Sequence, residues 1–201
     1  LNIREIILAI SVLFWTIRLS FFLFQRVKRV GKDKRFDNYK FSFSKFLLAW
    51  ITQGLWVFIC LFPILIVFSS PANDEIIYLA FGGLIYLVGM VIEIIADYQK
   101  TAHNKLNNKK RKFISSGLWS RSRHPNYFGE FLIWTGITTI CFPVFSGFKY
   151  LALITPIFIY FLLNYISGVN LLEERAKEMW GNNPEYVKYL KTTPKFFPKI
   201  F

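Results

Sequence analysis

The sequence has few of the residues that build disulfide scaffolds and metal centres. Among its 201 residues there are two cysteines and two histidines. Cys60 and Cys141 both lie inside apolar stretches, where a free thiol packs as a small hydrophobe, so they say nothing about the redox compartment. Since the histidines are His103 and His124 alone, we expect no zinc, haem or other metal site.

Acidic residues are scarce as well, and so are the signals of a soluble nucleotide-binding fold. Twelve Asp and Glu residues stand against 25 Lys and Arg, which gives a net charge of +13. The basic residues fall into clusters separated by long apolar stretches, a pattern that indicates membrane topology rather than nucleic-acid binding. No glycine-rich phosphate loop follows a strand, so any nucleotide would have to bind between helices.

Apolar and aromatic residues dominate what remains. Hydrophobic residues make up 54% of the chain and aromatic residues 19%, with 23 Phe. A bilayer core requires about 20 apolar residues per helix. Segments of that kind predict an all-α fold: a polytopic transmembrane helical bundle with about five spans, at residues 6–24, 46–68, 76–96, 127–145 and 150–169. We expect one integral-membrane domain over residues 1–201, and the absence of an initiator Met suggests a piece of a longer chain.

The distribution of Lys and Arg predicts how the spans are oriented. Residues 25–45 and 97–126 and the tail after residue 169 are rich in Lys and Arg, whereas the short links at 69–75 and 146–149 carry a single Lys. The positive-inside rule therefore places the amino end outside, and both basic loops and the carboxyl-terminal tail in the cytoplasm. The tail is amphipathic and predicts two short interfacial helices broken at Gly181.

Three ionisable residues lie within or at the edges of the predicted spans. Arg18, Glu93 and Glu130 come from three helices and reach the same depth near the cytoplasmic face. A charge at a helix centre costs about 2.5–3.5 kcal/mol on insertion scales, so such residues require partners or water. Asp97 follows Glu93 by four residues, and Glu130 follows Asn126 by four, so each pair shares a helical face. We interpret them as lining a polar cavity; the alternative is that they are interfacial charges that snorkel to water.

The densest polar segment is residues 116–130. It contains Arg121, Arg123 and His124 directly before Pro125, where a helix is expected to start. Exposed N–H groups at a helix amino terminus favour negative charge, so the segment is suited to hold a phosphate or a carboxylate. Taken alone, a His in this position is more often a capping or hydrogen-bonding residue than a catalyst.

Three runs together carry a resemblance to a known family: residues 117–130 with the Arg-His-Pro-Asn-Tyr-Phe-Gly-Glu sequence, residues 93–100 (Glu-Ile-Ile-Ala-Asp-Tyr-Gln-Lys), and Leu-Leu-Glu-Glu at 171–174. The chain resembles the steroid 5α-reductase-like membrane family, and within it an uncharacterised bacterial branch. The resemblance implies a bacterial cell-membrane enzyme that uses NADPH to reduce a carbon-carbon double bond in a lipid or steroid-like enone.

The same resemblance implies roles for individual residues. Asp97 and Glu93 would face the nucleotide, Asn126 and Glu130 its nicotinamide half, and Arg18 and Arg26 its phosphate or ribose groups. The expected cofactor-binding set is Arg18, Arg26, Glu93, Asp97, Arg123, His124, Asn126, Tyr127 and Glu130. The catalytic residues stay unassigned, because Trp15 stands where the reductases have a Tyr, and the helices that would carry their catalytic Glu would precede Leu1.

Two alternatives to the reductase remain open. The Arg-His-Pro-x-Tyr-x-Gly run is also similar to isoprenylcysteine carboxyl methyltransferases, which would imply S-adenosylmethionine near His124 and Glu173 or Glu174, and a lipid or isoprenylated thiol as substrate. A non-catalytic lipid-binding protein is the second alternative. In each case the expected partners are the bilayer and a hydrophobic, lipid-like small molecule, and the sequence does not indicate an oligomeric state.

Overall fold

The computed structural model describes residues 2–30, 41–71, 75–107, 112–166 and 168–199, and the secondary structure in these ranges is entirely helical. Five helical stretches are long and apolar enough to cross a membrane: Ile3–Lys28, Phe43–Phe68, Ile76–Leu106, Pro125–Val144 and Gly147–Trp180. The structure therefore confirms the all-α fold and the five predicted spans, and the chain is an integral membrane protein. Which membrane holds it, and which end of the bundle faces the cytoplasm, stay predictions.

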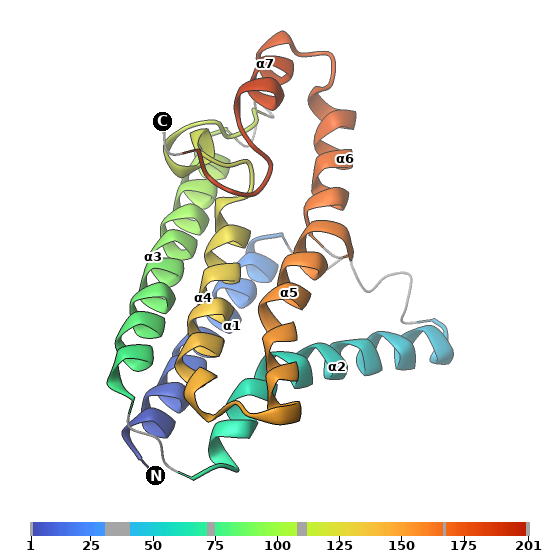
Figure 1. Ribbon diagram of the computed structural model, residues 1–201. Helices are drawn as coiled ribbons and strands as arrows, with labels where there is room; N and C mark the ends of the chain where they lie inside the picture. Colours follow the sequence, from blue (N-terminus) through green and yellow to red (C-terminus); the bar gives the residue numbers. More distant parts are fainter. Residues whose placement is uncertain (1, 31–40, 72–74, 108–111, 167, 200–201) are drawn as a thin grey trace.

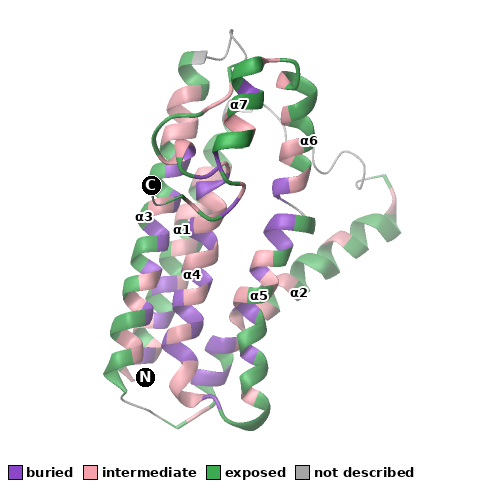
Figure 2. Ribbon diagram, turned by 45° about the horizontal axis from the view of Figure 1, so that its top comes forward, coloured by how far each residue is buried: buried purple, intermediate pink, exposed green. Residues whose placement is uncertain are grey.

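The spans form a bundle around one pair of helices. α3 (Ile76–Asn107) and α4 (Pro125–Cys141) run side by side, and α1 (Ile3–Val30) packs behind them (Figure 1). α5 (Ile154–Phe161) covers the other side of α4, and the carboxyl-terminal helices α6 (Val169–Trp180) and α7 (Pro184–Thr192) extend beyond it. Buried residues concentrate on α4, half of whose span is buried (Figure 2). The core thus lies around α4.

Glycine residues bring α3 and α4 into close contact. Gly82 and Gly89 on α3, seven residues apart, face Gly136 and Gly129 on α4, which have the same spacing. A Cβ atom on Gly82 would lie 2.7 Å from the Gly136 carbonyl oxygen, and one on Gly89 would lie 2.7 Å from the Gly129 carbonyl oxygen. Small residues allow membrane helices to approach backbone to backbone, where van der Waals packing holds them together. We call these four glycines the glycine seam.

α3 is longer than the apolar stretch that predicts it. Its 32 residues span roughly 48 Å at 1.5 Å per residue, against a hydrocarbon core of about 30 Å. The predicted span ended at residue 96 because polar residues begin there, but no proline or glycine interrupts the next turns, and the helix continues to Asn107. The additional turns carry Asp97, Gln99 and Lys100 on the same rod as the span.

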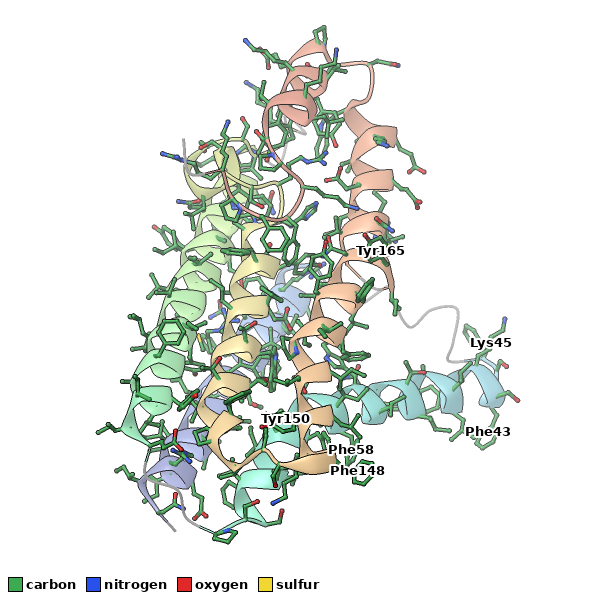
Figure 3. All side chains as sticks on the ribbon, in the orientation of Figure 1. Phe43, Lys45, Phe58, Phe148, Tyr150 and Tyr165 are labelled. Atoms are coloured by element: carbon green, nitrogen blue, oxygen red, sulfur yellow. The ribbon has the colours of Figure 1, made fainter. Side chains whose placement is uncertain are left out.

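α2 (Phe43–Phe68) contacts the bundle through its last third. Its buried residues are Cys60, Pro63, Ile64, Ile66 and Val67. The first half projects away from the other helices (Figure 1), with Phe43 and Lys45 at its far end (Figure 3). Most side chains of this half are apolar and exposed, as expected for a segment that contacts lipid.

The last predicted span is less regular than the single helix expected at residues 150–169. It consists of a 3₁₀ segment (Gly147–Leu153), α5 and a π-helical turn (Leu162–Ile166). Within the π turn, the Asn164 side-chain amide donates to the Tyr160 carbonyl (3.0 Å), which places a side chain in the backbone hydrogen-bond ladder. α6 then continues in line with α5 (Figure 1). Two tail helices follow the span with a break at residues 181–183, as predicted, and their interfacial position stays a prediction.

Candidate functional site

The polar residues singled out from the sequence gather at one end of the bundle, which we call the basic end. It comprises the last turns of α3, the 3₁₀ turn η2 (Gly117–Ser120), the first turns of α4, and α6 with α7. In Figure 1 it is the upper part of the molecule, where the carboxyl terminus also lies. Side chains there form two buried clusters.

The first is the acid cluster, which consists of Arg18, Glu93, Asp97 and Glu130. The Arg18 guanidinium bridges two carboxylates on α3, with one hydrogen-bonded ion pair to Glu93 and another to Asp97 (Nη1 to Oδ2, 3.3 Å). Both acids are buried, at 4% and 7% exposure, and Glu130 on α4 is 9% exposed. Arg18 is therefore paired inside the protein, and does not snorkel to water.

The glycine seam determines where the acids of this cluster lie. A Cβ atom on Gly129 would lie 2.8 Å from the Glu93 backbone nitrogen and 2.9 Å from the Glu93 Cβ atom. Glu130, the next residue, is thereby held beside Glu93 across the seam. The sequence interpretation placed these charges at the same depth, but the spaced glycines that bring them together were missed, although their seven-residue spacing is visible in both helices.

The segment before α4 is tied to α3 by side-chain hydrogen bonds. The Leu118 amide donates to the Gln99 side-chain oxygen (3.0 Å), and the Trp119 indole N–H donates to the Ala96 carbonyl (3.1 Å). Gly117 has φ of +63°, a conformation that favours glycine, and a Cβ atom there would lie 2.4 Å from the Gln99 side chain. Lys100 lies over the Trp119 ring, 4.9 Å from its centroid.

The second cluster centres on Glu173 of α6, and we call it the Glu173 cluster. Glu173 accepts one bond from Arg123 Nη1 (2.6 Å) and one from His124 Nε2 (2.8 Å). Burial lowers the pKa of His124, and the neighbouring Glu173 carboxylate opposes that shift without cancelling it. The neutral ring therefore carries its proton on Nε2, which leaves Nδ1 as an acceptor.

Sequence reasoning named Glu173 only for the methyltransferase alternative, whereas the structure makes it the partner of both Arg123 and His124. The Glu-Glu pair at 173–174 was the available signal. The pair alone does not reveal which glutamate faces inward, because the sequence predicts a separate interfacial helix there and not a helix that continues α5 along the bundle.

The chain after α7 folds back over the segment that precedes α4. We call residues 193–199 the strap. The Arg123 amide donates to the Pro194 carbonyl (2.9 Å), and the Ser122 hydroxyl donates to the Phe196 carbonyl (2.7 Å). Phe196 is 4% exposed and packs among the rings of Phe128, Phe131 and Tyr160. The strap thus fixes the backbone that positions Arg123 and His124, a contact that the sequence did not predict.

Several polar atoms at the basic end are buried and find no hydrogen-bond partner within the described residues. They are Arg18 Nε, Glu93 Oε2, Arg123 Nε, His124 Nδ1 and Asn126 Oδ1, and Trp15 Nε1 lies nearby on α1. Buried polar groups in native proteins almost always have partners. At the opposite end of the bundle, Arg4 donates to the Glu75 carbonyl (3.2 Å) and has two further nitrogens of this kind. A polar ligand with both donors and acceptors would complete the basic end.

The nine predicted cofactor residues are not equally placed. Arg18, Glu93, Asp97 and Glu130 form the acid cluster, and Arg123 and His124 belong to the Glu173 cluster. Tyr127 stacks on the His124 ring, with centroids 5.8 Å apart, and Asn126 stands at the first turn of α4. Arg26 is exposed and lies near Asp97 and Lys100 without belonging to a cluster. Cofactor binding by all nine residues stays a prediction.

The absence of a metal site, expected from the sequence, stays a prediction. No group of three His, Cys, Asp or Glu side chains there is arranged to hold a metal ion, and Cys60 and Cys141 are buried free thiols. The clusters instead combine carboxylates, guanidinium groups and a neutral imidazole, which suits recognition of a charged organic molecule.

Comparison with known proteins gives a family match and one partial relative. A family model described as a protein of unknown function, DUF1295, matches residues 1–193. The probable O-methyltransferase ustE of Ustilaginoidea virens is 39% identical over 69 residues, which is 33% of this chain. That match covers 24% of the relative, so the chain corresponds to about a quarter of its length. No solved structure matches.

Proposed function

We propose a function for this chain, which belongs to the DUF1295 family. It is a membrane-embedded enzyme that uses NADPH to reduce a carbon-carbon double bond of a lipid or steroid-like enone. The observation that carries the proposal is the set of buried polar atoms without partners at the basic end. They occur in both clusters, so a ligand that satisfies them would have to reach from one cluster to the other.

The two clusters differ in charge in the way that an extended dinucleotide requires. Arg123, Lys100 and Lys195 surround the Glu173 cluster with positive charge, and guanidinium and ammonium groups suit phosphates. The neutral His124 offers Nδ1 as an acceptor for a ribose hydroxyl. Glu93 and Glu130 in the acid cluster, and the Asn126 oxygen at the first turn of α4, can accept from a carboxamide.

NADPH, when bound, would supply a hydride to the substrate. The residues of the chain bind and orient the reactants and exclude water. The acid cluster lies inside the helical bundle at the depth of the last turns of the spans, so a substrate that enters from the bilayer can reach it without leaving an apolar environment. This is consistent with a lipid-like substrate.

A second candidate is an S-adenosylmethionine-dependent methyltransferase acting on a lipid or isoprenylated thiol. The printed name of the partial relative favours it. Within the chain, Glu93 and Glu130 could face a sulfonium, and Arg123 could bind the carboxylate of the cofactor. We prefer NADPH, because several cations around the Glu173 cluster fit a ligand with several negative charges.

Side-by-side titration of the purified full chain with NADPH and S-adenosylmethionine, followed by thermal unfolding in detergent, tests the proposal. A ligand at 100 times its Kd stabilises the folded state by about 2.7 kcal/mol. We expect stabilisation by NADPH and little by S-adenosylmethionine. The reverse result would make the chain a methyltransferase, and no effect from either would favour the non-catalytic alternative. Arg175→Gln serves as a control, because Arg175 is exposed on α6 and lies outside the predicted cofactor-binding set, so it should affect NADPH binding less than Arg123→Gln.

A further inference from the structure

We propose that Glu93 and Glu130 share one proton at neutral pH, and that this pair is the acid that protonates the substrate. The assignment of a role to the proton rests on the proposed reductase function, whereas the presence of the proton rests on the structure alone.

Glu93 and Glu130 are neighbours on two helices that cannot move apart without opening the seam. The backbone and Cβ atom of Glu93 lie against Gly129, and Glu130 is the next residue along α4. The two side chains are 4% and 9% exposed, and they interact electrostatically with each other. Two interacting carboxyl groups in one buried cluster do not both ionise readily, and one shared proton relieves the repulsion.

One guanidinium, that of Arg18, faces three acids, because Arg18 and Asp97 both act electrostatically on Glu93 and on Glu130. Arg18 pairs with Glu93 and with Asp97, and Glu130 has no ion pair within the described ranges. Glu93 Oε2 is buried and accepts no hydrogen bond there. From α2 the neutral thiol of Cys60 faces Glu130, and from α3 the Tyr86 hydroxyl already donates to the Ser11 carbonyl (2.8 Å). Lys100 acts on Asp97.

The proposed reaction requires a proton at this place. Saturating a carbon-carbon double bond adds one hydride and one proton. NADPH, when bound, would supply the hydride with its two electrons to one carbon, and the π pair would shift toward the conjugated carbonyl. The resulting enolate would take its proton from the carboxyl pair, which would leave both glutamates ionised beside Arg18 until the pair takes up a proton from the solvent. Reduced cofactor and one proton are consumed in each turnover.

Trp15 complements the pair without replacing it. It lies three residues before Arg18, on the same face of α1, and its ring packs edge-on against Trp134 with centroids 5.1 Å apart. Its indole N–H is buried and has no acceptor in the described part of the chain. An indole N–H can donate a hydrogen bond to a substrate carbonyl, but it does not give up its proton at neutral pH. The proton must therefore come from another group.

Infrared spectroscopy of the full chain in detergent at neutral pH tests the shared proton. We expect the carbonyl band of a protonated carboxylic acid, shifted in deuterated water and shifted again when the protein is made with ¹³C-labelled glutamate. The band should disappear in Glu130→Gln and remain in Asp97→Asn. The isotope label identifies glutamate without any substitution, so the wild-type protein is sufficient for the test. A wild-type spectrum with no band of a protonated glutamic acid at neutral pH would overturn the proposal.

The catalytic role has its own readout. Saturating NADPH, with binding verified by thermal stabilisation, should move the glutamic acid band because the cofactor lies beside the pair. A band that stays in place while NADPH is bound would overturn the role of the pair as the acid. Absence of NADPH stabilisation would contradict the proposed function instead, so the two failures are distinguishable.

Discussion

The glycine seam leads to a sharp prediction, because two adjacent glycines of α3 differ in what surrounds them. A Cβ atom on Gly82 would lie 2.7 Å from the Gly136 carbonyl oxygen and from the backbone nitrogen of Ile140, whereas Gly83 has nothing within 4 Å. Packed atoms optimally lie about 3.5 Å apart, so Gly82→Ala would force the two helices to separate by roughly half an ångström or more. We expect the substitution to destabilise the fold by about 1–3 kcal/mol.

Gly83→Ala is the matched control. It adds the same methyl group to the same turn without a clash, and alanine is favoured over glycine in helix interiors by about 1 kcal/mol. Its stability should be unchanged or slightly higher. Thermal unfolding of the two variants and the wild type in one detergent measures the difference. Equal stability of Gly82→Ala and Gly83→Ala would show that α3 and α4 are not in backbone contact, and would remove the basis for placing Glu93 beside Glu130.

Three further predictions follow from the basic end. Arg18→Met leaves two carboxylates buried without a counter-ion and should lower the free energy of unfolding by about 3–5 kcal/mol. Arg26→Met should lower it little, and similar losses in the two variants would refute the ion pairs of the acid cluster. Because burial lowers the pKa of His124, the unfolded chain binds more protons than the folded chain near pH 6.5, so the free energy of unfolding should fall as the pH drops through 6.5. His124→Gln should flatten this part of the stability profile, and a profile unaltered by the substitution would contradict the buried position of His124. Phe196→Ala should lower the free energy of unfolding by about 3–5 kcal/mol, because the side chain of Phe196 is buried. Phe197→Ala should lower it clearly less, because Phe197 is 54% exposed, and the opposite order would contradict the docking of the strap.

The sequence predicted those features that depend on apolar length and on the cost of buried charge. Apolar stretches of bilayer length predicted five spans, and the structure has them. Arg18, Glu93 and Glu130 were expected at one depth because a charge inside a span requires a partner, and Arg18 indeed pairs with Glu93. Such features follow from one segment at a time.

Features that depend on contacts between segments were not predicted. The docking of the strap requires Phe196 to find three rings on α4 and α5, and no local pattern specifies that. The pairing of Glu173 with both Arg123 and His124 depends on α6 continuing from α5 through a π turn. The projection of the first half of α2 was not predicted either, because most of its side chains are apolar and their spacing marks no buried face.

We propose that the basic end binds a reduced nicotinamide nucleotide, and energy transfer from tryptophan to the bound nucleotide measures this binding without a substrate. Trp15 and Trp119 lie beside the two clusters, and NADPH absorbs where tryptophan emits. Excitation of tryptophan in the purified full chain should produce sensitised NADPH emission that saturates with concentration in the wild type and is strongly weakened in a folded Arg123→Gln variant. No saturable sensitised emission, or an equal signal in Arg123→Gln, would contradict the claim.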